Sequence, residues 1–154
     1  MTRRDLEDEA ARAATEGRSC IALRARRLSR VVTKLFEDAL RGHGITVAQF
    51  TLLGAAVLEG PLQPARLARM LDLEKSTLSR NLRLLEAAGL VRIASADGEP
   101  GRRVTATDRG RRKLVYALPA WREAQALAVG ALGDVVVGRL DAMIAALGRP
   151  ASGR

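Results

Sequence analysis

The feature that most constrains the fold is a set of three short, closely spaced helical segments with sharply marked ends. Thr46 and Gln49 form a Thr-x-x-Gln capping box, which predicts a helix over residues 47–58. A Gly-Pro break follows, and a proline in a first-turn position opens a second helix over residues 64–71. A tight connection then leads to a third helix over residues 75–88. The middle of the chain is therefore predicted to consist of three short helices.

Two strand-like segments follow these helices. They cover residues 90–93 and 102–106, and the stretch Asp97-Gly98-Glu99-Pro100-Gly101 between them is rich in turn formers. Two short helices joined by a tight connection, the second followed by a hairpin, is the order of a winged helix-turn-helix. We predict a mainly α fold with a small β-hairpin wing, in which residues 46–107 form the winged helix-turn-helix.

Further helices are predicted on both sides of this domain. Residues 19–41 form an amphipathic helix, and the pair Thr107-Asp108 caps a long helix that is expected to bend at Pro119 and to end near Gly130 or Gly133. Residues 134–147 form a last helix. Residues 1–17 have no sustained apolar period and are interpreted as a flexible arm or a short leading helix.

The winged domain does not need these flanking helices, so their apolar stripes must be buried elsewhere. Pairing with a second copy of the chain satisfies both stripes, and a homodimer is the commonest kind of oligomer. We therefore expect residues 18–45 and 108–148 to form a helical dimerisation region. An intramolecular helical hairpin is the alternative.

The charge of the chain points to a polyanionic partner. The 154 residues carry 26 Lys+Arg against 17 Asp+Glu, a formal net charge of +9, and 23 of the 26 cations are arginine. Arginine is the side chain best suited to bidentate contact with phosphate and guanine. Ten cations and four acids lie between Lys75 and Lys113. A compositional bias toward arginine would have spread the positive charge evenly along the chain. Instead, the charge is concentrated in this segment.

The third short helix has the composition of a DNA-reading element. Leu78, Leu82 and Leu85 form a core-facing stripe on it. The major groove needs small side chains that let the helix enter and a few long cations that reach bases or phosphates. We predict that DNA is contacted by the outward residues Lys75, Ser76, Thr77, Ser79, Arg80 and Arg83, and by the wing residues Arg102 and Arg103. The alternative is that these polar residues merely start the helix and solvate it.

Other classes of function have little support. With one histidine and one cysteine the chain cannot build a zinc site, and it has no P-loop, Rossmann or G-x-S-x-G pattern. We predict no catalytic residues, no metal and no cofactor, and hence no enzyme. The chain also lacks an uninterrupted apolar span and a secretory leader pattern, so a cytoplasmic protein with no membrane partner is expected.

Between about Cys20 and Leu147 the sequence resembles the multiple antibiotic resistance regulator (MarR) family of bacterial transcription factors. The motifs that carry the resemblance are Gly44-Ile45-Thr46-Val47-Ala48-Gln49-Phe50-Thr51-Leu52-Leu53, Leu67-Ala68-Arg69-Met70-Leu71, Ser76-Thr77-Leu78-Ser79-Arg80, Leu85-Glu86-x-x-Gly89-Leu90-Val91 and Ala106-Thr107-Asp108-Arg109-Gly110.

Two positions depart from the family pattern. Glu74 stands where an Asp is usual, and Asp97-Gly98-Glu99 replaces the Asp-x-Arg of the wing.

The resemblance implies a homodimer of two winged domains that reads a pseudo-palindromic operator, most simply as a repressor released by a small-molecule effector. It also implies an effector site between the dimer helices and the winged domain, to which Arg24, Phe50 and Trp121 could contribute. Phe50 has a competing interpretation as a plain core residue.

Cys20 lies at a helix start between Arg18 and Arg24, where the thiolate would be stabilised. Its placement resembles the sensing cysteine of the organic hydroperoxide regulators within the family. A thiol-based oxidant sensor is thus an alternative function, and a small buried helix cysteine is the more frequent occurrence. A non-specific architectural nucleic-acid-binding protein is the alternative from a different class; it would use the same charge without a recognition helix or dimer helices.

Overall fold

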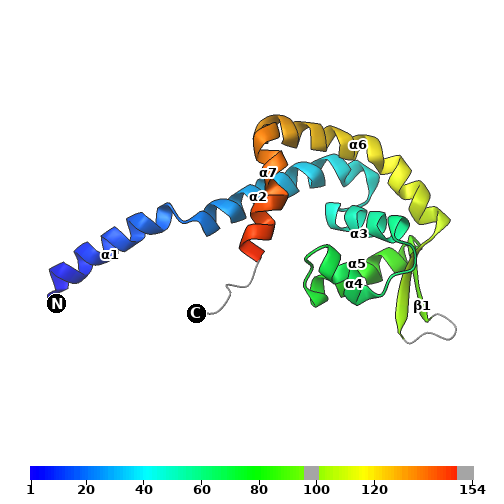
Figure 1. The fold of residues 1–154 in the computed structure, drawn as a ribbon, viewed down its shortest axis with the longest axis horizontal. Helices are drawn as coiled ribbons and strands as arrows, with labels where there is room; N and C mark the ends of the chain where they lie inside the picture. The colour runs from blue at the N-terminus through cyan, green and yellow to red at the C-terminus, as the bar shows by residue number, and fades with distance from the viewer. Residues whose placement is uncertain (96–100, 149–154) are drawn as a thin grey trace. The chain divides into compact units, whose positions relative to one another are not determined.

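The structure is a computed structural model that describes residues 1–95 and 101–148, and within these the chain divides into two compact units, residues 1–35 and 36–154. Figure 1 follows the chain through its elements. They are, in order, α1 (Arg3–Arg18), α2 (Ile21–Leu40), a 3-10 turn (Arg41–His43), α3 (Val47–Leu58), α4 (Pro64–Met70), α5 (Lys75–Ala87), β1 (Val91–Ser95), β2 (Arg102–Ala106), α6 (Asp108–Leu132) and α7 (Asp134–Gly148).

The first unit contains α1 and most of α2. The segment interpreted as a flexible arm or a short leading helix is helical over 16 residues. Thr2 caps it, because its hydroxyl accepts from the Asp5 amide and the Asp5 carboxylate accepts from the Thr2 amide. No α1 residue is buried in the single chain, so the helix is held by its cap and its own backbone rather than by packing.

The second unit begins with the end of α2 and enters α3 through the predicted cap. The Thr46 hydroxyl accepts from the Gln49 amide at 3.2 Å, and the Gln49 side chain accepts from the Thr46 amide at 3.1 Å. This confirms the capping box. A further acceptor comes from α2: the Glu37 carboxylate accepts from the Val47 amide at 3.0 Å. A negative charge at a helix N-terminus also interacts favourably with the helix dipole.

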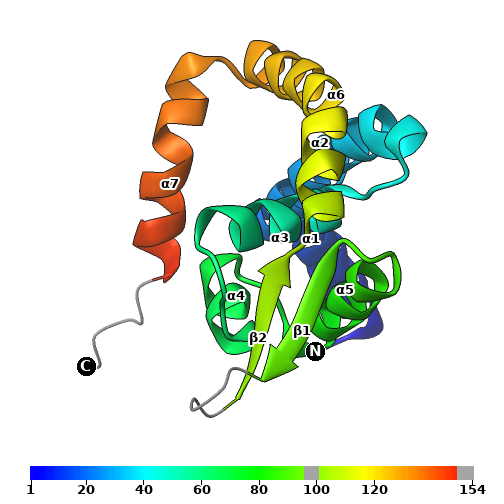
Figure 2. The same ribbon diagram turned by 90° about the vertical axis from the view of Figure 1, so that its right-hand side faces the viewer.

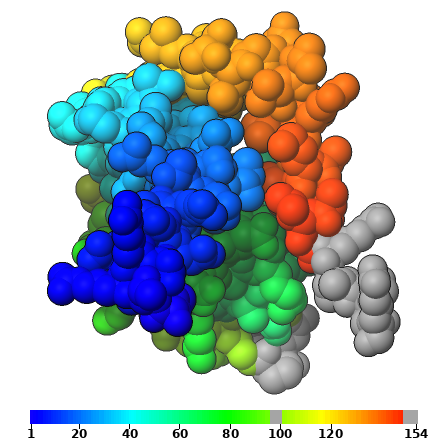
Figure 3. Space-filling model, turned by 90° about the vertical axis from the view of Figure 1, so that its left-hand side faces the viewer, coloured from blue at the N-terminus to red at the C-terminus, as the bar shows by residue number. Residues whose placement is uncertain are grey.

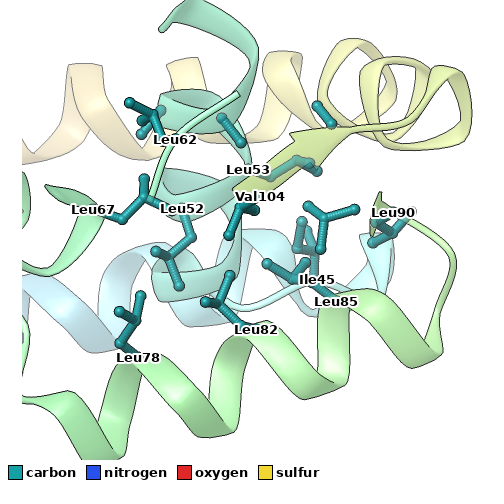
Figure 4. Close-up of a cluster of buried hydrophobic side chains, with 14 of the residues drawn as sticks. Ile45, Leu52, Leu53, Leu62, Leu67, Leu78, Leu82, Leu85, Leu90 and Val104 are labelled. Atoms are coloured by element: carbon teal, nitrogen blue, oxygen red, sulfur yellow. The ribbon is translucent and has the colours of Figure 1, made fainter. Parts of the chain in front are cut away.

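Leucines from the three short helices form the core of this unit. Leu52 and Leu53 of α3, Leu67 of α4 and the α5 stripe form one cluster with Val104 of the hairpin, as Figure 4 shows. Each of these residues is at most 5% exposed. The α5 stripe was predicted from its spacing and is confirmed: Leu78, Leu82 and Leu85 are all buried.

The hairpin pairs β1 with β2 in antiparallel register from Val91↔Ala106 to Ser95↔Arg102 (Figure 2). The predicted turn at Asp97, Gly98, Glu99 and Pro100 lies outside the described residues. Leu62 adds a contact that the sequence did not reveal. Its amide donates to the Val104 carbonyl at 3.1 Å and its carbonyl accepts from the Val104 amide at 2.8 Å. The chain before α4 is thereby joined to the wing.

One junction holds the hairpin base to the start of α6. The Thr107 hydroxyl accepts from the Gly110 amide, and it lies 2.7 Å from the Gly89 carbonyl and 3.1 Å from that of Leu90, to which it can donate. A Cβ on Gly110 would stand 2.1 Å from the Leu90 carbonyl oxygen, so no side chain fits there without displacing backbone. The end of α5, the wing and α6 therefore meet at Thr107 and Gly110.

The two C-terminal helices differ in length and burial. α6 continues for 25 residues through Pro119, and Figure 1 shows it change direction along its length. Gly133 separates it from α7, which has no buried residue and is visible along its length in Figure 3. No helix in the described part of the chain is long and apolar enough to cross a membrane.

Candidate nucleic-acid interface

The outward face of α5 carries all six of its predicted DNA-contacting side chains. Each of them is exposed, while the stripe of Leu78, Leu82 and Leu85 on the same helix is buried. The exposed residues are Lys75, Ser76, Thr77, Ser79, Arg80 and Arg83. The Arg80 side chain makes no hydrogen bond or ion pair with any described residue. Two arginines and a lysine thus stand beside short hydroxyl side chains on one surface, which is the mixture that direct base readout requires.

The angle between α4 and α5 is set by a sharp backbone turn. Asp72 has φ +47°, the left-handed conformation that a non-glycine residue rarely adopts. The Leu73 amide donates to the Ala68 carbonyl at 2.9 Å, which closes the end of α4. The turn at Asp72 therefore keeps the connection between α4 and α5 short.

The first turn of α5 has no side-chain cap. Glu74 occupies the N-cap position and makes no cap hydrogen bond. The longer Glu side chain is a poorer N-cap than the Asp that is usual here, because caps act through short side chains. The helix start is left open on the side that carries Lys75 and Ser76.

At the other end of α5, Glu86 positions the wing. Its carboxylate accepts from the Ile93 amide of β1 at 3.0 Å, in a partly buried setting. Sequence reasoning did not single out this contact, although Glu86 belongs to the family motif. The sequence gives little sign of this contact, because an acid near a helix end normally faces solvent.

The two wing arginines have different environments. Arg102 is exposed and pairs in register with Ser95, at the end of the described hairpin. Arg103 is half-buried, and its guanidinium donates to the Pro61 carbonyl at 3.4 Å. The sequence treated the two as equivalent, but the structure ties Arg103 to the loop before α4 and leaves Arg102 at the surface.

A groove of about 230 Å³ lies between α5 and the wing. Its floor is apolar, from Leu78, Leu82 and Ile93, and three cations line it: Lys75, Arg83 and Arg102. The one acid in its lining, Glu86, is already hydrogen-bonded to Ile93. α5 and the wing thus contribute cations to the same groove.

The residues proposed for effector sensing fall in both units. Phe50 and Trp121 are brought together, with their rings stacked at 5.8 Å and 10°, and Phe36 lies 6.0 Å from the same Trp121 ring. Phe50 and Trp121 line an apolar cavity of about 320 Å³. Phe50 is half-buried rather than fully packed into the core. Arg24 is an exposed residue of α2 in the first unit.

Cys20 is exposed, which corrects the interpretation of a buried helix cysteine. It precedes the first residue of α2, so it lies outside the apolar stripe of that helix. Hydrogen bonds from the Leu23 and Ala22 amides lower the pKa of the Cys20 thiol. His43 is half-buried, and its ring lies 4.8 Å from that of Tyr116.

Comparison with known proteins places this arrangement in a family. The family model described as the MarR family matches residues 43–103. The crystal structure of the M. tuberculosis transcriptional regulator MosR is 34% identical, with a TM-score of 0.71 over 84% of this chain and 93% of that one. The chain belongs to the MarR family. No curated protein matches it.

Two further structures extend the comparison. MosR in complex with DNA is 33% identical, with a TM-score of 0.72 over 84% of this chain and 93% of that one. CouR from Rhodococcus jostii, bound to p-coumaroyl-CoA, is 20% identical with a TM-score of 0.72 over 87% and 95%, a likeness of fold.

Family membership makes the chain a winged-helix transcriptional regulator of the MarR type rather than an enzyme. No cluster of three or more potential metal ligands occurs in residues 1–95 and 101–148.

Proposed function

We propose that this MarR-family protein is a homodimeric, sequence-specific repressor that binds a pseudo-palindromic operator in the cytoplasm and leaves it when a small molecule binds. The observation that carries the proposal is the face of α5, where every predicted DNA-contacting side chain is exposed above a buried leucine stripe. Ser76, Thr77, Ser79 and Arg80 read base edges, and the cations at the groove contact phosphates.

The wing contributes through Arg102. It is the exposed member of the arginine pair, and it shares the groove with Lys75 and Arg83 of α5. A minor groove next to the α5 site would attract such an arginine through its negative potential. Arg103 serves mainly to hold the wing against Pro61.

The dimer rests on unburied apolar surface in the helical region of residues 18–45 and 108–148. Val136, Met143, Ile144 and Leu147 of α7 are 41% to 86% exposed in the single chain. Exposed apolar stripes of this size on a helix are typical of a protein interface. Two winged domains related by a two-fold axis match an operator with two half-sites.

The effector site is the apolar cavity beside the Phe50–Trp121 stack. Stacked rings and an apolar lining suit a ligand with an aromatic group. CouR, which shares the fold, is bound to p-coumaroyl-CoA in its crystal structure. Arg24 would supply a cation to the ligand only if the dimer brings it to the cavity.

The test is a selection of duplexes from fragmented genomic DNA by the purified full chain. We expect one enriched site with two-fold symmetry, bound at least about 10³-fold more tightly than a shuffled duplex. Equal affinity for any duplex would contradict the proposal and favour the architectural alternative.

The oxidant-sensing alternative has one specific observation in its favour, the exposed thiol with a lowered pKa at Cys20. Treating the operator complex with an organic hydroperoxide tests it. We expect the wild type and Cys20→Ser to stay bound equally. The organic hydroperoxide regulators that Cys20 resembles hold their cysteine with tyrosines near the second helix, where this chain has Val47 and Phe50. Release of the wild type alone, reversed by dithiothreitol, would make Cys20 the sensor.

A further inference from the structure

A second cavity, of about 420 Å³, lies at the start of α6 and has no part in the proposed DNA or effector sites. Its α6 wall consists of Arg109, Arg112, Lys113 and Tyr116, and Gly44 and Leu90 lie in its lining. All of these residues belong to the second unit. The lining contains three cations and no acid.

The spacing of the α6 residues places the three cations of the lining close together. Arg109, Arg112, Lys113 and Tyr116 follow one another at i, i+3, i+4 and i+7, so they share one face of the helix. Like charges at these spacings repel and destabilise a helix. None of the three cations forms an ion pair with a described residue. An anion between them would offset the repulsion.

Two residues of the lining make close contacts. The Lys113 ammonium lies 3.5 Å from the position of a Cβ on Gly44, whose φ of +59° favours glycine. Tyr116 contacts the His43 ring, and His43 Nδ1 is buried with no hydrogen-bond partner in the described structure.

The position of the cavity separates it from the proposed DNA surface. Leu90 immediately precedes β1, and Val91 pairs with Ala106 at that end of the hairpin. Arg102 pairs with Ser95 at the other end, four residues along the strand, which is about 13 Å at the usual rise. Figure 2 shows α6 beginning beyond the arrowhead of β2, and Arg102 is the first residue of that strand.

We propose that this cavity binds the phosphate group of a small molecule. A phosphate monoester carries about −1.5 to −2 charges at pH 7, which compensates three cations better than a single carboxylate does. Arg109 and Arg112 can each donate two parallel hydrogen bonds to phosphate oxygens, and Lys113 adds a point charge. The apolar remainder of the lining accommodates the group that bears the phosphate. A DNA phosphate has the same chemistry, but the distance from Arg102 disfavours it.

The test is calorimetric titration of the full chain with pyrophosphate, in the absence of DNA. We expect saturable binding of one pyrophosphate per chain, weakened at least about tenfold by Arg112→Gln through loss of a charge-assisted pair. Arg111→Gln is the matched control, because Arg111 neighbours Arg112 on α6 but does not line the cavity. It should change the affinity less than about twofold. Arg112→Lys should restore part of the binding.

Several results would overturn the proposal. Absence of saturable pyrophosphate binding would do so, as would equal weakening by Arg111→Gln and Arg112→Gln, which indicates diffuse attraction. If pyrophosphate does not bind while Arg112→Gln weakens DNA binding and lowers the salt slope by about one unit, the cations contact DNA backbone. Because the titration contains no DNA, its failure leaves the proposed repressor function intact.

Discussion

Helices α5 and α7 lie in the same unit and have similar lengths, 13 and 15 residues, yet they differ in whether their apolar side chains are buried within the chain. α5 buries Leu78, Leu82 and Leu85 within its own chain and keeps a polar outer face. α7 buries none of its residues, and Met143, Ile144 and Leu147 are more than half exposed. Burying one such side chain stabilises a protein by about 1.5–3 kcal/mol. α5 is therefore complete in one chain, whereas the apolar face of α7 lacks a partner.

This difference separates two kinds of surface. A helix that is already anchored can present small polar side chains to DNA, because its stability does not depend on that face. A helix with an unburied apolar face is suited to contact protein. We therefore assign DNA reading to α5 and self-association to α7, and the experiments below test or refine that division.

The largest effect should come from the junction that fixes the end of α5. Gly110→Ala places a Cβ 2.1 Å from the Leu90 carbonyl oxygen. Overpacking against backbone should lower the free energy of unfolding by about 3 kcal/mol, at the upper end of such changes. Thermal unfolding followed by circular dichroism measures it.

Gly54→Ala in α3 is the control, because a Cβ there meets nothing within 4 Å. It should be neutral or stabilise the protein by up to about 1 kcal/mol through helix propensity. Equal losses in both variants would mean that Gly110 is an ordinary helical glycine.

The next effect concerns α7. Met143→Glu puts a charge on the exposed apolar stripe and should weaken the dimer by about 2 kcal/mol or more, roughly thirtyfold in dissociation constant. Analytical ultracentrifugation across a concentration series measures this. Ala145→Glu, on the opposite side of the helix by sequence spacing, should leave the dimer unchanged. A monomeric wild type, or equal dimer affinity in the two variants, would contradict the assignment of self-association to α7.

A smaller effect is expected at Thr107. Thr107→Ala removes the α6 cap and its link to Gly89, and should lower the free energy of unfolding by about 1 kcal/mol, up to 2. Thr51→Ala is the control, since its exposed hydroxyl only bonds back to the Val47 carbonyl within α3. That change should be within about 0.5 kcal/mol of neutral. Urea unfolding measures both variants. Similar losses of unfolding free energy would mean that the Thr107 cap contributes no more than an ordinary helical threonine.

The smallest effect is at the start of α5. Glu74→Asp supplies a short carboxylate where no side-chain cap is present, and should raise the free energy of unfolding by about 0.5–1 kcal/mol. Glu74→Gln removes the charge without a good cap and should not stabilise. If Glu74→Gln raises the melting temperature as much as Glu74→Asp, the gain does not come from capping, because Gln is not a good cap.

Local features of the fold were predictable from the sequence. The Thr46 cap, the break expected at Gly130 or Gly133 and the α5 leucine stripe depend on neighbouring residues, so the sequence carries their signal directly. The same stripe identifies which α5 residues face outward. The candidate recognition face was therefore predictable residue by residue.

Contacts between distant segments were not predictable in this way. The pairing of Leu62 with Val104, the bond from Glu86 to Ile93 and the tie from Arg103 to Pro61 join residues 7 to 42 positions apart. No periodicity or cap motif encodes such contacts. For the same reason the sequence treated Arg102 and Arg103 alike.

The central claim is that α5 reads DNA sequence, and Arg80→Ala tests it most directly. The variant and the wild type are titrated by fluorescence anisotropy against the selected operator and against a shuffled duplex at one salt concentration. We expect a loss of about 1–3 kcal/mol on the operator and a much smaller loss on the shuffled duplex, because the exposed, unpaired Arg80 contacts bases. Equal losses on both duplexes would contradict the claim, since they would mean that Arg80 touches only phosphate.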